Sequence, residues 1–151
     1  MTPKDLHYLQ PLAIFGVSSR GQGFGALAFR ELRKAGIEAY AVNPKGGQWN
    51  GETLFTGLQE LPKPPLAAII LIKGMGAITA VEEAAANGVK KIWLQGGSDS
   101  PEIRERCAGL GLETLRGECI LMRSGGFPHN LHRLIHDFLA RKRRWQRRNM
   151  K

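Results

Sequence analysis

Four glycines follow a short apolar run near the start of the chain, and their spacing could bind a phosphate group. The apolar run is Leu12–Phe15, and the glycines are Gly16, Gly21, Gly23 and Gly25. Glycine leaves backbone N–H groups open to an anion, and a helix that begins after such a loop points the positive end of its dipole at the same place. Residues 21–26 match the dinucleotide-binding fingerprint G-x-G-x-x-[GA], although about five residues separate them from the apolar run. We predict a phosphate site here, with an ordinary surface loop as the alternative.

A lysine follows the second predicted strand, where NAD-binding domains usually carry an acidic residue for the ribose hydroxyls. The sequence at this place is Asn43-Pro44-Lys45. A lysine favours a ribose that carries a phosphate, which leaves two ligand classes, NADP and coenzyme A. The alternative interpretation of Lys45 is an ordinary exposed side chain.

The residue types that catalyse reactions or bind metals are not arranged for either task. His129, His132 and His136 fall on the polar side of a predicted helix with no fourth ligand, while Cys107 and Cys119 fit neither a CxxC motif nor a zinc site. Cys119 is the best candidate nucleophile, but no base is positioned for it. We therefore expect a binding protein, not an enzyme, with no catalytic residue and no metal site.

The net charge of +9 is concentrated at one end of the chain. Residues 141–151 hold seven Lys or Arg and no acid, which leaves 15 basic and 13 acidic residues in residues 1–140. A module that binds nucleic acid or another anionic partner through this tail, with Trp145 available for stacking, is an alternative function. We favour a solubilising helix end for the tail and do not expect nucleic acid as a partner.

Apolar strands and helical patterns alternate along the chain, which predicts an α/β fold with a doubly wound, parallel, Rossmann-like sheet of about five strands. The strands are expected at 12–15, 37–42, 66–72, 91–95 and 112–115, and the helices at 26–35, 77–87 and 101–110. Residues 1–11 are expected to be a lead-in, and residues 45–52 a loop. The third strand is apolar throughout and should lie at or near the centre of the sheet.

The elements must bring the candidate residues to one edge of the sheet. Ligands of doubly wound sheets lie outside the carboxyl ends of the strands. We therefore expect the glycine loop, the Asn43–Gln48 loop and the turns after the third and fourth strands to meet there.

We expect one domain over residues 1–124, with an amphipathic helix and basic tail over residues 125–151 docked on it. At helical spacing, one side of that helix collects Leu131, Leu134, Ile135 and Phe138. The chain has no apolar run long enough to span a bilayer, and its N-terminus lacks the apolar region of a signal peptide. We expect a cytoplasmic protein.

Six short stretches occur in a consistent order along about residues 8–122. They are Phe15-Gly16-Val17-Ser18, Phe24-Gly25, Val42-Asn43-Pro44-Lys45, the turn after the third strand, Trp93-Leu94-Gln95 and Gly117-Glu118-Cys119-Ile120. Together they resemble the small CoA-binding-domain proteins, which are similar to the CoA-binding domain of succinyl-CoA synthetase alpha subunits and of ADP-forming acyl-CoA synthetases. The chain departs from the family pattern in its longer Gly21–Gly25 loop and in Lys73–Gly76, where relatives often have a proline.

The resemblance implies a stand-alone protein that binds coenzyme A or acyl-CoA and senses, carries or regulates it without ligase chemistry. The resemblance implies that residues of the glycine loop contact the pyrophosphate and that residues after the second strand contact the phosphate on the adenosine ribose. Residues after the third strand are implied to lie near the bound nucleotide. The implied cofactor residues are Gly16, Val17, Ser18, Ser19, Arg20, Gly23, Phe24, Gly25, Asn43, Pro44, Lys45, Ile72 and Lys73. An acyl-CoA-metabolising enzyme is the implied protein partner. An NADP-dependent oxidoreductase of minimal size remains the alternative, although a catalytic Tyr/Lys pair or Ser is not visible.

Overall fold

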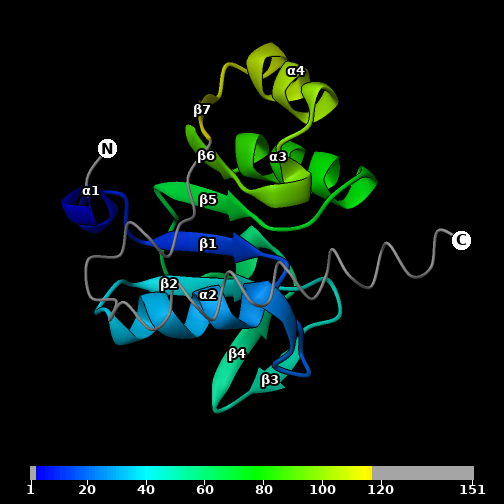
Figure 1. Ribbon diagram of the computed structural model, residues 1–151. Coiled ribbons are helices and arrows are strands. Elements are labelled where there is room, and N and C mark those ends of the chain that lie inside the picture. The colour runs from blue at the N-terminus through cyan, green and yellow to red at the C-terminus, as the bar shows by residue number, and fades with distance from the viewer. Residues whose placement is uncertain (1–2, 117–151) are drawn as a thin grey trace, which may run out of the picture.

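The computed structural model describes residues 3–116, which form a seven-stranded sheet with helices on both faces (Figure 1). The strands are β1 (Leu12–Phe15), β2 (Ala39–Val42), β3 (Gly47–Trp49), β4 (Glu52–Phe55), β5 (Ala67–Ile70), β6 (Lys91–Leu94) and β7 (Glu113–Leu115). The helices are α1 (Pro3–Tyr8), α2 (Gly23–Lys34), α3 (Met75–Ala86) and α4 (Pro101–Gly109), with short 3-10 turns η1 (Leu58–Glu60) and η2 (Gly96–Ser98). The predicted Rossmann-like α/β fold is confirmed.

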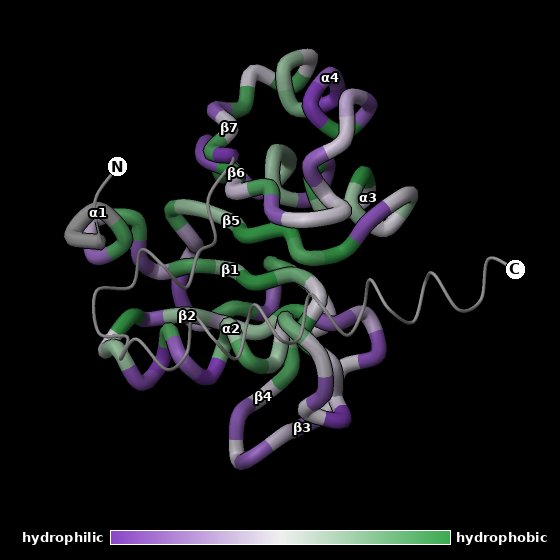
Figure 2. The backbone as a smooth tube through the Cα atoms, viewed as in Figure 1, coloured by the Kyte–Doolittle hydropathy of each residue, from purple (hydrophilic) through white to green (hydrophobic). Residues whose placement is uncertain are grey.

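The strand order is β3-β4-β2-β1-β5-β6-β7, so β1 is central and β5 lies beside it. Strand β1 pairs in parallel with both β2 and β5, and β5 pairs in parallel with β6. All four residues of β1 and of β5 are buried, and both strands are continuously hydrophobic in Figure 2. Continuous burial is what a parallel strand covered on both faces requires.

Two apolar clusters, one on each face of the sheet, form the core. On one face, Phe29 and Leu32 of α2 pack over Ile14, together with Leu6 from α1. On the other face, the cluster is formed by side chains of α3, α4 and the strands beneath them, among them Val81, Ile103, Ala68 and Ile70. Packed apolar side chains therefore cover the sheet on both faces.

The structure corrects the prediction of a loop at residues 45–52. These residues contain β3 and the start of β4, which form an antiparallel hairpin, and β4 also pairs in parallel with β2. Asn50 and Gly51 connect the two strands with φ values of 52° and 74°, as an Asn-Gly hairpin turn requires. The sheet therefore has seven strands and not the expected five or so, because β3 and β4 of this hairpin were not predicted.

The N-terminal segment and the start of α2 also differ from the predictions. Residues 1–11 were expected to be a lead-in, but α1 forms there because Leu6 and Leu9 bury their side chains in the core. Helix α2 begins at Gly23, three residues before the predicted start, so part of the expected loop is helical. The predicted helix and tail at 125–151, and Cys119, lie outside the described residues.

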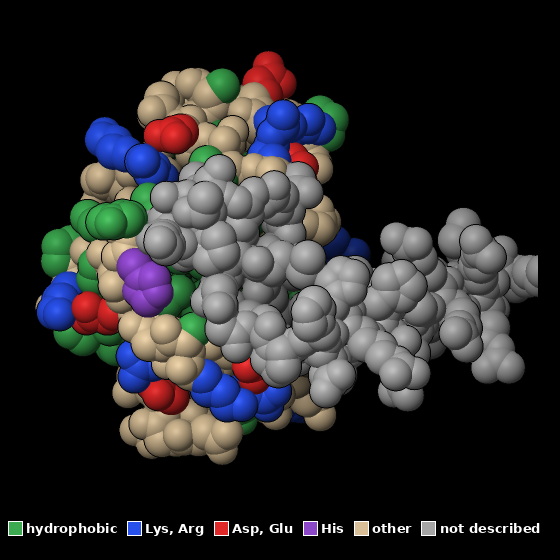
Figure 3. All heavy atoms as spheres, turned by 60° about the vertical axis from the view of Figure 1, so that its left-hand side comes forward, with side chains coloured by type: hydrophobic (Ala, Val, Ile, Leu, Met, Phe, Trp, Pro, Cys, Tyr) green, Lys and Arg blue, Asp and Glu red, His purple; other side chains and the backbone are tan. Residues whose placement is uncertain are grey.

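The described surface carries mixed charges. Figure 3 shows Lys and Arg side chains next to Asp and Glu on the face around α1. Several charged side chains of the described residues pair, for example Lys63 with Glu38 at 2.9 Å and Arg106 with Glu82 at 2.8 Å. Such exposed pairs contribute little to stability. Within residues 3–116, no helix has both the length and the apolar character that crossing a membrane demands.

We expect the stability of the fold to fall as the pH rises from about 10 to about 12, because of Tyr40. Burial of the ring and the hydrogen bond from its hydroxyl to Glu38, 2.7 Å long, raise the pKa of Tyr40 to about 12. The folded protein thus keeps a proton that the unfolded chain loses near pH 10. Urea unfolding as a function of pH measures the effect, which Tyr40→Phe should remove. Tyr8→Phe, which changes an exposed tyrosine, should behave like the wild type; a pH dependence that survives Tyr40→Phe would contradict the assignment.

Candidate functional site

A cleft of about 930 Å³ opens at the carboxyl edge of the sheet, toward which β1 and β5 point in Figure 1. It extends over the ends of β4, β2, β1, β5 and β6. Three separate segments predicted from the sequence line it together: Gly16, Val17, Ser18, Ser19 and Arg20 after β1, Asn43, Pro44 and Lys45 after β2, and Ile72 and Lys73 after β5. The parallel topology brings these segments together because each follows the carboxyl end of its own strand.

Gly16 allows the first segment to turn sharply away from β1. Its φ is +103°, a conformation that L side chains rarely adopt, and a Cβ there would lie 2.9 Å from Cγ2 of Ile72. The chain then makes a tight turn, in which Gly21 N–H donates to the carbonyl of Ser18 at 3.1 Å and the Ser18 hydroxyl accepts from Arg20 N–H at 3.2 Å. Gly16 therefore has no room for a side chain, and its backbone lines the cleft.

Gly23, Phe24 and Gly25 do not line the cleft but form the first turn of α2. A Cβ on Gly25 would overlap the carbonyl oxygen of Gly16, so only glycine lets the helix pack this closely on the strand end. Within the described residues, no side chain caps the N-terminus of α2. The helix therefore points its positive dipole end toward the loop from close range.

Asn43 fixes the second segment against the first. Its side-chain amide donates to the carbonyl of Val17 at 2.9 Å, while its Oδ1 accepts from the backbone N–H of Lys45, also at 2.9 Å. An ionised aspartate could accept the second bond but could not donate the first. Asparagine at this place therefore joins the two loops and positions Lys45, whose side chain is exposed at the cleft.

The third segment packs against the turn after β6. A Cβ on Gly97 would lie 3.3 Å from both Cβ and Cδ of Lys73, so the stem of this lysine runs along the Gly97 backbone. The turn is held in place by the buried Ser98, whose hydroxyl donates to the carbonyl of Ile70 at 2.6 Å and accepts from Gln95 N–H at 2.8 Å.

Sequence reasoning missed a group of cleft residues on α3 and after β4. They are Thr56, Gly76, Thr79, Ala80 and Glu83. The α3 residues recur at i, i+3, i+4 and i+7, which marks one helix face, and that spacing was the available signal. Thr56 directly follows β4, a strand that was not predicted from the sequence.

The charges of the cleft suit a phosphate-rich ligand. Arg20, Lys45 and Lys73 come from three different loops, and the carboxylate of Glu83 lies on α3. Several cations that converge on one cleft attract and hold a polyanion. Residues 3–116 contain no group of three or more His, Cys, Asp or Glu side chains that could hold a metal ion.

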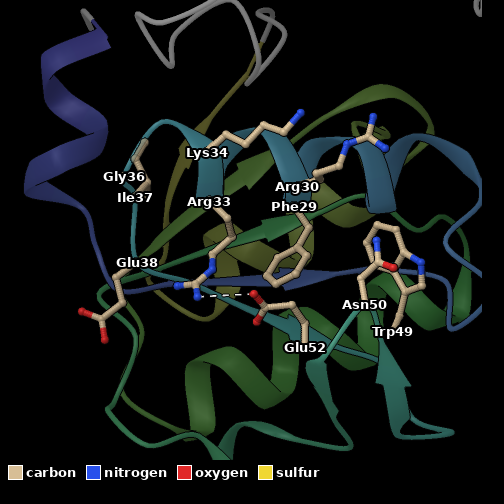
Figure 4. Close-up of a pocket in the computed structure, with 10 residues that line it drawn as sticks. All are labelled: Phe29, Arg30, Arg33, Lys34, Gly36, Ile37, Glu38, Trp49, Asn50 and Glu52. Atoms are coloured by element: carbon tan, nitrogen blue, oxygen red, sulfur yellow. Dashed lines mark hydrogen bonds and ion pairs between the residues drawn. The ribbon is translucent and has the colours of Figure 1, made fainter.

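A second cavity, of about 550 Å³, lies between α2 and the β3–β4 hairpin (Figure 4). Arg30, Arg33 and Lys34 of α2 border it on one side, and Trp49 lies on the hairpin side. Arg33 pairs with Glu52 at 3.4 Å. The cavity shares no lining residue with the cleft and contains none of the predicted site residues, so the cleft is the candidate site.

Comparison with known proteins finds a matching family model and similar solved structures. A model of the CoA binding domain matches residues 10–124. A conserved hypothetical protein from Pyrococcus furiosus is 29% identical, with a TM-score of 0.67 over 73% of this chain and 95% of the other. A hypothetical protein from Pyrococcus horikoshii OT3 is 22% identical, with a TM-score of 0.70 over 82% and 89%. The dinucleotide forming acetyl-coenzyme A synthetase 1 of Ca. Korarchaeum cryptofilum is 20% identical, with a TM-score of 0.60 over 72% of this chain but only 26% of the synthetase.

Proposed function

The chain belongs to the CoA binding domain family, and we propose that it is a stand-alone protein that binds coenzyme A or acyl-CoA to sense, carry or regulate it. The observation that carries the proposal is the cleft at the carboxyl edge, where three loops meet and bring together the Gly16 backbone and the cations Arg20, Lys45 and Lys73. A linear ligand with phosphates at two places matches that arrangement.

The proposal places the parts of coenzyme A in the order of the strands. The diphosphate lies over the end of β1, at Gly16–Arg20 and the N-terminus of α2, where backbone N–H groups and the helix dipole favour it. The phosphate on the ribose lies at Lys45, after β2. The pantetheine then crosses Ile72 and Lys73 toward the turn after β6.

In the described part of the chain, the cysteine and the histidine both lie away from the cleft, which supports a binding role without chemistry. Cys107 is buried, and burial raises the pKa of its thiol, so it is a poor nucleophile. His7 on α1 is the one histidine in the described range, and it does not line the cleft. We therefore propose that a separate acyl-CoA-metabolising enzyme of the cytoplasm uses the bound cofactor.

We expect Lys45→Ala to remove the preference for the ribose phosphate. A lysine–phosphate contact is a charge-assisted hydrogen bond of about 1–3 kcal/mol, so the wild type should bind coenzyme A roughly five- to a hundredfold tighter than 3′-dephospho-CoA. The variant should barely distinguish the two ligands, because either change alone removes the same contact. Calorimetry of the wild type and Lys45→Ala with each ligand gives the affinities from which the coupling between Lys45 and the ribose phosphate is calculated.

Lys90→Ala is the matched control, because Lys90 is exposed and lies outside the cleft. It should keep the preference of the wild type. An unchanged preference in Lys45→Ala would show that a residue other than Lys45 contacts the ribose phosphate. Tighter binding of NADP than of coenzyme A by the wild type would overturn the ligand assignment.

A further inference from the structure

Glu83 is a carboxylate in a cleft whose other charged residues are cations. Helix α3 carries it to the β4 end of the cleft, where its Oε1 accepts a hydrogen bond of 2.6 Å from the backbone N–H of Leu58. A Cβ on Gly57 would lie 2.9 Å from the same oxygen. Oε1 thus faces the Gly57–Leu58 backbone. Within residues 3–116, Oε2 accepts no hydrogen bond.

A phosphate cannot be the group that Glu83 meets. Two anions repel each other, and the phosphates have Arg20, Lys45 and Lys73 available elsewhere in the cleft. A half-buried carboxylate that a ligand covers needs a hydrogen-bond donor from that ligand, since it loses water when the ligand binds. This donor group of the ligand must therefore lie at the β4 end of the cleft, next to Glu83.

The order of the strands identifies which part of the ligand reaches that end. With the diphosphate over β1 and the ribose phosphate at Lys45 after β2, the next strand along the sheet is β4. The part of coenzyme A beyond the ribose in that direction is the base. Thr56 after β4 and Ala80 on α3 line the cleft at the same end and offer a partly apolar surface to a ring.

We propose that Oε2 of Glu83 accepts a hydrogen bond from the exocyclic amino group of adenine, so that the cleft selects an aminopurine over an oxopurine. The inference rests on the proposed function, because it assumes a nucleotide with its ribose phosphate at Lys45. Hypoxanthine presents a carbonyl oxygen where adenine presents the amino group. Two acceptors would then face each other, which disfavours binding.

Binding of adenosine 3′,5′-bisphosphate and inosine 3′,5′-bisphosphate to wild type and Glu83→Gln tests the proposal by calorimetry. We expect the wild type to bind the adenosine compound about tenfold tighter. Glutamine keeps an oxygen for Leu58 N–H and presents an NH₂ group to the cleft, which donates to the hypoxanthine carbonyl. The variant should therefore lose the preference or reverse it.

Glu82→Gln is the matched control, because Glu82 is the neighbouring residue on α3, pairs with Arg106 and does not line the cleft. It should keep the preference of the wild type. Equal binding of the two bisphosphates by the wild type would overturn the inference even if Glu83→Gln fails to fold, and so would an unchanged preference in a folded Glu83→Gln. If the wild type binds neither bisphosphate nor coenzyme A, the proposed function itself fails.

Discussion

Gly25→Ala is expected to cost about 3 kcal/mol of folding stability and to abolish coenzyme A binding. The new Cβ would overlap the carbonyl oxygen of Gly16, which is backbone and cannot rotate away. Helix α2 would have to move off the end of β1, and the loop between them would move with it. Urea unfolding followed by circular dichroism measures the first effect, and calorimetry with coenzyme A measures the second.

Gly109→Ala is the matched control for this substitution. Gly109 is also helical, in α4, but a Cβ there would have no neighbour within 4 Å. Alanine in a helix is favoured over glycine by up to about 1 kcal/mol, so the control should be neutral or slightly stabilising. A Gly25→Ala protein that unfolds like the wild type would show that α2 does not need to lie so close to the strand.

The central part of the fold was predictable because its signals are local. The apolar runs that become β1 and β5 are buried on both faces, which requires apolar residues at every position. The β3–β4 hairpin was missed although Asn50-Gly51 is a strong turn signal. Its strands are only three and four residues long, and β3 starts at a glycine, so they show little alternation.

The candidate site was predictable where a residue directly follows its own strand. Lys45 and Lys73 were found in this way, because parallel strands carry the residues that follow them to a common edge. Glu83 was not found, because it reaches the cleft through the packing of α3 and its bond to Leu58, which are tertiary contacts. The role of Asn43 was also not predicted. The sequence shows only that no acidic residue stands at this place, whereas the structure shows a side-chain amide that donates one hydrogen bond and accepts another.

Gly16→Val is expected to reduce coenzyme A binding by more than about a hundredfold and also to destabilise the fold. From the glycine loop alone, the sequence predicts a binding defect in a protein that still folds if the strand end tolerates the branched side chain. The structure adds a second effect, because a β-branched residue at φ +103° is strained by about 1–3 kcal/mol, and its Cβ would lie 2.9 Å from Ile72. The folded molecules that remain should still fail to bind, since Ile72 or the Gly16 backbone must shift to make room for the side chain, and both line the cleft where the diphosphate is proposed to lie.

Gly88→Val separates the two effects of that substitution. Gly88 has a similar φ of +81°, but a Cβ there would have no neighbour within 4 Å, and the residue does not line the cleft. It should therefore lose stability through backbone strain while its coenzyme A affinity, measured by calorimetry under conditions where the protein is folded, stays that of the wild type. If Gly16→Val bound coenzyme A as tightly as Gly88→Val, the ligand would not approach the backbone at Gly16. The open loop after β1 would then serve only to pack α2 against the sheet, and the diphosphate would have to lie elsewhere in the cleft, nearer to Lys45 and Lys73.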